Sequence, residues 1–180
     1  SKMESFANET MYGRLQSSKN DSTHYGVKKS LFYYEPTLMP EGTYSKDVNY
    51  KTWSAWPKKE ADNFGRSYNY PHVAAAHWVL YRLGRYHDGL VKQKDWKWYL
   101  ESAYHTSIAM VEQAPYYAQF GQMEGSVFVL ILDDLKREGL TEMATKMESA
   151  MKKRADHWRT LNYPFGSEMP WDSTGQEEVY

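Results

Sequence analysis

A repeated pattern between residues 70 and 161 constrains the fold more than any other feature of the sequence. Apolar residues recur there at the i, i+3, i+4, i+7 spacing of an amphipathic helix. We therefore predict four helices, and a fifth that begins near Thr174; the four cover about 71–87, 95–113, 122–138 and 141–161. The first and third are apolar nearly all round, which is typical of helices buried on most sides. The second and fourth are amphipathic, and the wet face of the fourth carries Lys146, Lys152, Lys153 and Arg154.

The connectors between these helices alternate in character as well. We call the two apolar helices inner and the two amphipathic helices outer. The link from an inner to an outer helix has no special composition, as in "DGLVKQK". The links from an outer to the next inner helix, here called the rich connectors, contain many aromatic residues, Gly, Pro and acids, as in "APYYAQFGQMEG" and "NYPFGSEMPWDSTGQEE". Antiparallel hairpins would place all the rich connectors at one end of the bundle, so the functional site is expected there. The inner helices begin about 50 residues apart, a period that indicates an array of helical hairpins, either a solenoid or a closed toroid.

Residues 1–69 are harder to assign to regular structure and form a separate, loop-rich region in our division of the chain, with residues 70–180 as the helical part. A short helix is expected over Met3 to Gln16, and Leu31 to Tyr34 is strand-like. The stretch that follows is rich in Pro, Gly and turn formers, and it predicts a long ordered loop with room for a small hairpin.

Charge and composition exclude several classes of function. The chain has 22 basic and 23 acidic residues, which disfavours electrostatic binding to nucleic acid or to a membrane surface. No apolar run reaches the roughly 18 residues of a membrane span, and the polar start "SKMESFANET" is not a secretory signal. The absence of cysteine removes disulfides and thiol chemistry. No metal-binding, nucleotide-binding or esterase motif is present, so no metal or cofactor is expected.

Three segments carry a resemblance to a known family. The segments "RSYNYPHVAAAHWVLYRLGRYHDGL", "YAQFGQMEGSVFVLILDDLKREG" and "YPFGSEMPWDSTGQEEVY" resemble large secreted proteins with a six-hairpin-glycosidase-like (α/α)6 toroid. The resemblance covers roughly residues 66–180 and implies an all-α fold of alternating inner and outer helices. It further implies a secreted carbohydrate-active enzyme whose poly- or oligosaccharide substrate binds over the starts of the inner helices.

The chain departs from this family in its length. Six hairpins of about 50 residues need roughly 300 residues, and only two hairpins and the start of a third are present. We therefore expect the chain to be a segment of a larger polypeptide that supplies the remaining hairpins.

Glycoside hydrolysis generally uses two carboxyl groups, one a general acid and the other a base or nucleophile. The acids of the rich connectors are the candidates: Asp172, Glu124, Glu177 and Glu178, with Glu168 the weakest. Each has a structural alternative. Thr174 and Glu177 fit a T-x-x-E capping box, Ser173 and Gln176 fit a second register of it, and acids near a helix start also suit the helix dipole.

Polar and aromatic residues at the same end are candidates for substrate binding. Flat amphipathic rings suit sugar surfaces, although such rings also fill protein cores. The candidates are Trp171, Tyr70, His72, Asn69, Gln122 and Tyr117. His72 could also act as an acid or base, or be a structural residue of the rim.

Three functions remain open from the sequence. The first is a glycoside hydrolase that pairs Asp172 with another connector carboxylate. The second is a polysaccharide lyase on the same scaffold, which would use Tyr70, His72, Asn69 and Arg66. The third is a non-catalytic helical-repeat module that binds glycan or protein, because fold alone does not decide function.

Overall fold

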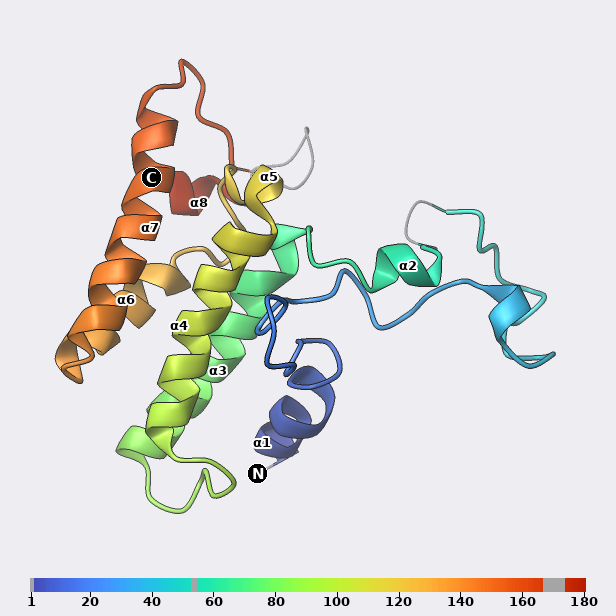
Figure 1. Ribbon diagram of the computed structural model, residues 1–180, viewed down its shortest axis with the longest axis horizontal. Coiled ribbons are helices and arrows are strands. Elements are labelled where there is room, and N and C mark those ends of the chain that lie inside the picture. The colour runs from blue at the N-terminus through green and yellow to red at the C-terminus, as the bar shows by residue number, and fades with distance from the viewer. Residues whose placement is uncertain (1, 53–54, 167–173) are drawn as a thin grey trace.

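The computed structural model describes residues 2–52, 55–166 and 174–180 (Figure 1). Helices dominate these residues and no strand occurs among them, so the predicted all-α class is confirmed. The longer helices are α3 (Tyr70–Tyr86), α4 (Trp96–Gln113), α6 (Val127–Arg137) and α7 (Thr141–Arg159). The short ones are α1 (Lys2–Phe6), α2 (Lys58–Ala61), α5 (Pro115–Ala118) and α8 (Gln176–Val179), with irregular turns η1 (Ala7–Met11), η2 (Pro36–Leu38) and η3 (Ser67–Asn69).

The four long helices start and end where local signals predict. Pro71 occupies the first turn of α3, where its missing N–H costs no hydrogen bond. Asp95 caps α4 by accepting a hydrogen bond from the Trp98 N–H at 2.8 Å. Gly139 ends the α6 hairpin with a φ of +73°, a backbone conformation that glycine adopts without strain. Only α6 departs clearly, because it begins at Val127 instead of near residue 122.

Burial is distributed differently from the predicted alternation of inner and outer helices. The predicted outer helix α4 buries ten of its residues, more than any other helix described. The predicted inner helix α6 leaves Val129 61% and Leu130 43% exposed. The cause lies in the N-terminal region, which covers α4: Gln16 donates to Thr106 at 2.7 Å, and the Tyr25 ring stacks on His105.

The N-terminal helix is shorter than predicted. It ends at Phe6 and passes into the wider turn η1, instead of continuing to Gln16. Glu4 explains how this short element is held, because its buried carboxylate accepts hydrogen bonds from the N–H groups of Lys92 and Gln93 in the α3–α4 connector.

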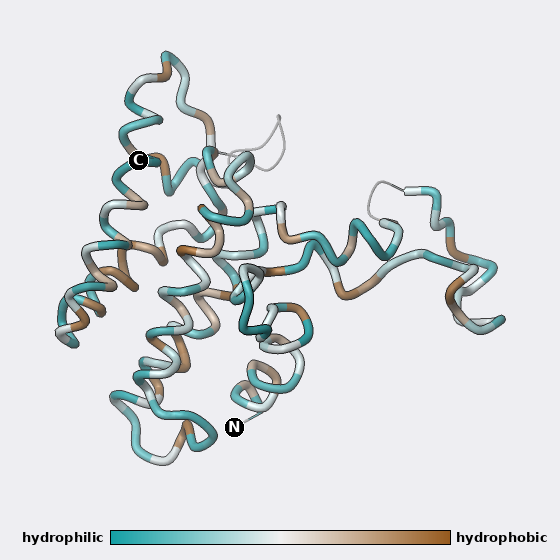
Figure 2. The backbone as a smooth tube through the Cα atoms, in the orientation of Figure 1, coloured by the Kyte–Doolittle hydropathy of each residue, from teal (hydrophilic) through white to brown (hydrophobic). Residues whose placement is uncertain are grey.

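Residues 31–52 belong to an arm that extends away from the helices (Figure 1). The predicted strand at Leu31 to Tyr34 does not form, because no neighbouring strand pairs with it among the described residues. The arm is held instead by tyrosines: the rings of Tyr34 and Tyr50 stack with centroids 4.7 Å apart, and Tyr44 meets both edge-on. Figure 2 shows hydrophobic residues recurring along this arm, outside the main core.

None of the described helices is both long enough and apolar enough to cross a bilayer.

Candidate functional site

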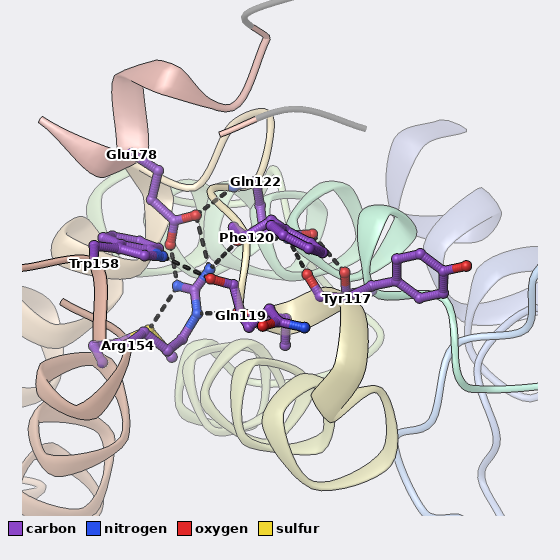
Figure 3. A network of polar contacts seen from close by, with 10 residues as sticks. Tyr117, Gln119, Phe120, Gln122, Arg154, Trp158 and Glu178 are labelled. Carbon is purple, nitrogen blue, oxygen red and sulfur yellow. Dashed lines mark hydrogen bonds and ion pairs between the residues drawn. The ribbon is translucent and has the colours of Figure 1, made fainter. Parts of the chain in front are cut away.

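The rich connectors meet at one end of the helices. Ser67, at the start of η3, donates its hydroxyl hydrogen to Oε1 of Gln122 at 2.8 Å. The backbone N–H of Gln122 donates in turn to Glu178 of α8 (Figure 3). Three segments that are far apart in the sequence are therefore joined here by direct hydrogen bonds.

Three glycines allow this close approach. A Cβ on Gly121, Gly166 or Gly175 would overlap the backbone of another member of the trio. Because backbone atoms cannot move aside as a flexible side chain can, each position requires the absence of a side chain. Gly121 and Gly175 come from the two different connectors that precede α6 and α8.

The end of α5 and the two residues after it present four consecutive carbonyl groups that side chains satisfy. Gln122 donates its amide hydrogens to the carbonyls of Tyr117 and Phe120, at 3.0 and 2.8 Å. Trp158 donates its indole N–H to the Gln119 carbonyl at 2.7 Å. The Ala118 carbonyl accepts from Nε of Arg154, also at 2.7 Å (Figure 3). Buried carbonyls without partners would be costly, so these side chains are what permit the irregular turn.

Arg154 is the centre of this network. Its guanidinium binds both carboxylate oxygens of Glu178, with Nη2–Oε2 at 2.9 Å, and donates to the Phe120 carbonyl at 3.0 Å. The two side chains are 7% and 8% exposed. A bidentate pair of this kind is geometrically specific as well as strong. Glu178, a predicted catalytic residue, is therefore neutralised and held inside the structure.

A second pair at this end faces the solvent. Oε2 of Glu124 lies 2.9 Å from Nδ1 of His72, and the two side chains are 54% and 40% exposed. His72 is in the first turn of α3, and Glu124 is in the turn before α6. The φ of Glu124 is +62°, which is uncommon for a residue other than glycine and marks a turn worth examining for function.

The remaining predicted binding residues at the start of α3 have structural partners. Tyr70 is fully buried, and its hydroxyl donates to the Phe64 carbonyl at 2.8 Å. Burial raises the pKa of Tyr70 to about 12, which disfavours its use as a base. Asn69 donates to the carbonyls of Lys28 and Lys29, and so ties the N-terminal region to α3. Tyr70 and Asn69, two of the four residues proposed for a lyase, are therefore engaged in structural hydrogen bonds.

The predicted binding residues of the α5–α6 connector divide between core and surface. Gln122 is fully buried and all of its amide contacts are within the network. Tyr117 is 40% exposed, and its ring lies tilted against Tyr68 with centroids 5.6 Å apart. Its neighbour Tyr116 is 66% exposed. An exposed aromatic edge therefore borders the site.

The last connector is described only in part. Glu177 is exposed in the single turn of α8, whose N-cap is Gly175 with no side-chain cap hydrogen bond. The other predicted residues of this connector, Asp172, Trp171 and Glu168, lie outside the described residues.

Arg154 was assigned to a wet helix face from the sequence, and this assignment is wrong. Its partners are 24 to 36 residues away in the chain, so helical periodicity carries no information about them. One signal was available: Arg154 lies four residues before Trp158, which is on the predicted apolar stripe, and its guanidinium lies 4.9 Å from that ring.

The chemistry available at the exposed pair is proton transfer. A carboxylate and an imidazole in direct contact can exchange or share a proton. The buried Arg154–Glu178 pair supports this end of the protein from within, and Tyr116 and Tyr117 add exposed aromatic surface beside it. No metal-binding cluster of three or more acidic or histidine side chains occurs in the part of the chain that the structure describes.

Comparison with known proteins places the chain in a family without assigning it an activity. The whole chain, residues 1–180, matches the family described as "Family of unknown function (DUF5695)", and the chain belongs to that family. No curated protein and no solved structure matches it.

Proposed function

We propose that this member of the DUF5695 family is a segment of a carbohydrate-active enzyme, and that Glu124 is an acid/base carboxylate of a glycoside hydrolase site. The observation that carries the proposal is the half-exposed contact between Glu124 and His72, made from a left-handed backbone position. Such a position costs free energy and persists where the surrounding structure holds it. Here it turns a carboxylate outward at the end where the connectors meet.

The second carboxylate of the proposed pair is Glu177. Of the connector acids in the described residues, Glu124 and Glu177 are exposed, whereas Glu178 is buried against Arg154. A buried carboxylate that holds a guanidinium is poorly suited to exchange protons with a substrate. Exposed carboxylates can approach a glycosidic bond from opposite sides, as the reaction requires.

The proposed architecture is a closed ring of helical hairpins, of which α3 to α7 would form a part. Support comes from α6, whose apolar first half leaves Val129 and Leu130 exposed. Neighbouring helices of a ring would cover this face and remove it from water.

The test is hydrolysis of a panel of poly- and oligosaccharides by the full-chain protein, with release of reducing ends as the signal. Glu124→Gln removes the carboxylate and keeps its shape, so activity should fall by 10²-fold or more, in line with the usual contribution of general acid–base catalysis. Glu9→Gln, at an exposed position of η1, is the matched control and should retain activity. Equal activity of Glu124→Gln and the wild type would exclude this role for Glu124.

One observation favours a second candidate, a glycan-binding module without catalysis. Tyr116 and Tyr117 are both exposed beside the site, and exposed aromatic rings are suitable platforms for sugars. The same assay separates the alternatives. Reducing ends, ultraviolet absorbance and retained glycan are measured together. A hydrolase releases reducing ends without ultraviolet absorbance, a lyase releases unsaturated products that absorb in the ultraviolet, and a binding module retains glycan and releases neither product.

A further inference from the structure

The carboxylate of Glu178 contacts the backbone of the turn that carries Glu124. On one side of Glu124, the N–H of Gln122 donates to Oε2 of Glu178. On the other side, Gly125 lies so close to Glu178 that an added Cβ would overlap the carboxyl carbon. The Glu178 carboxylate therefore contacts the backbone both before and after Glu124, although it is 56 residues from Gln122 in the sequence.

The turn itself has few other restraints. Gly125 N–H donates to the Gln122 carbonyl at 2.9 Å, and Val127 N–H donates to the Glu124 carbonyl at 3.0 Å. These local bonds close the turn but do not explain a left-handed residue in its middle. A left-handed backbone is unfavourable for a residue other than glycine, so tertiary contacts must hold it. Glu178 supplies the contacts on either side of Glu124, and the Gln122 amide and the His72 ring supply the others.

Glu178 is in turn fixed by Arg154 on α7. The guanidinium binds both carboxylate oxygens and also holds the carbonyls of Ala118 and Phe120, earlier in the same connector. Helix α7 therefore holds Arg154, Arg154 holds Glu178, and Glu178 contacts the turn that carries Glu124 (Figure 3). Movement of Glu178 would be transmitted directly to the backbone at Glu124.

We propose that Glu178 is a positioning residue, which sets the backbone turn so that the Glu124 side chain meets His72. This inference rests on the proposed function for its catalytic meaning, but its geometric content is independent of any activity. In this proposal Glu178 is not a catalytic acid, as the sequence predicted, but acts through the position of Glu124.

The experiment uses Glu178→Gln in the full-chain protein. The amide keeps the shape of the carboxylate but turns an NH₂ group toward the guanidinium, so the bidentate pair is lost. The readout is the nitrogen chemical shifts of the His72 ring, assigned by their absence in His72→Gln. A carboxylate oxygen accepts hydrogen bonds, so the contact with Glu124 favours a His72 ring that carries a hydrogen on Nδ1. In Glu178→Gln we expect the His72 shifts to move toward those of a ring that exchanges between both tautomers.

The matched control is Glu138→Gln. Glu138 is also largely buried, at 9% exposure, and also binds an arginine, Arg85, with Nε 3.0 Å away. It follows the C-terminal end of α6, away from the Glu124 turn. Its loss should weaken the fold comparably and leave the His72 shifts unchanged.

Gly125→Ala is the second variant, needed if Glu178→Gln does not fold. It leaves Arg154 and Glu178 intact and pushes their carboxylate away from the turn, so the same change in His72 shifts is expected. Wild-type His72 shifts in every folded variant would overturn the proposal, and so would an equal change in Glu138→Gln.

Activity is measured on the same variants to separate the two proposals. If glycan hydrolysis is found, a misplaced Glu124 should reduce kcat by on the order of 10²-fold in Glu178→Gln, and an unchanged kcat would contradict the positioning role. If the wild type is inactive but Glu178→Gln or Gly125→Ala changes the His72 shifts and Glu138→Gln does not, the positioning role stands and the proposed hydrolase function fails.

Discussion

Glu124 and His72 join the starts of two helices, with Oε2 and Nδ1 2.9 Å apart across 52 residues of sequence. One partner is in an ordinary first helical turn, and the other is in a left-handed turn that glycine would occupy more easily. The chain therefore carries a glutamate at a position where the backbone conformation favours glycine.

Replacing Glu124 by glycine should give a more stable protein than replacing it by alanine. Both changes remove the contact with His72, but only glycine relieves the left-handed strain, by about 1 kcal/mol. Urea unfolding measures the difference. Glu148, exposed in the middle of α7, is the matched control: there glycine should be about 1 kcal/mol less stable than alanine. The same order at both positions would contradict the strain at Glu124.

Arg154→Met should be among the most destabilising substitutions in the chain. It leaves the Glu178 carboxylate buried without its cation, and breaking a buried pair in this way costs about 3–5 kcal/mol. The double variant Arg154→Met, Glu178→Met removes both charges, so it should be more stable than Arg154→Met alone. Denaturant unfolding of the two single variants and the double variant completes the cycle. A double variant as unstable as the sum of the two single variants would show that the ion pair carries no coupling.

Gly175→Ala should destabilise the junction of the connectors. Its φ of −94° suits any residue, so the cost comes from overlap of the new Cβ with the Gly121 carbonyl and the Gly166 backbone. Overpacking of this kind costs about 1–3 kcal/mol. Gly84→Ala is the control, since its Cβ would find its nearest neighbour at 3.4 Å and the site is within α3. That variant should be neutral or more stable by up to about 1 kcal/mol. Thermal unfolding compares the two, and equal shifts would argue against the glycine contact.

His77 should make the fold less stable in acid. Its ring is fully buried, with Nε2 2.9 Å from Oε1 of Gln16, and burial lowers the pKa of His77 from 6.5 to about 3. Below pH 6.5 the unfolded chain takes up a proton at this histidine that the folded chain does not. The free energy of unfolding should therefore fall by up to about 1.4 kcal/mol per pH unit from pH 6.5 towards pH 3, and the contribution is complete above pH 6.5.

The check on His77 is urea unfolding of the wild type and His77→Gln at several pH values. Glutamine can still donate to Gln16 and has no proton to gain in this range. The variant should lose stability less steeply between pH 6.5 and 4 than the wild type. Parallel curves would mean that other groups cause the acid sensitivity.

Local patterns determined most of the helical part of this protein. Helical periodicity predicted α3, α4 and α7 within a few residues, because the spacing of apolar side chains is a property of the segment itself. Antiparallel hairpins then required the rich connectors to lie at one end, where the structure has them in contact. The late start of α6 marks the limit of such reasoning. Residues before Val127 form the left-handed turn, and Glu178 takes the Gln122 N–H.

Only the tertiary structure decided the roles of the side chains at the site. Arg154 belongs to a polar helix face by periodicity, yet it is buried because carbonyls from another connector and Glu178 surround it. Glu178 and Glu177 are adjacent acids in the sequence, yet one supports the structure and the other is exposed. The physical reason is that burial and hydrogen-bond partners depend on residues distant in the chain. A sequence pattern identifies which groups can do chemistry, and packing decides which of them remain free to do it.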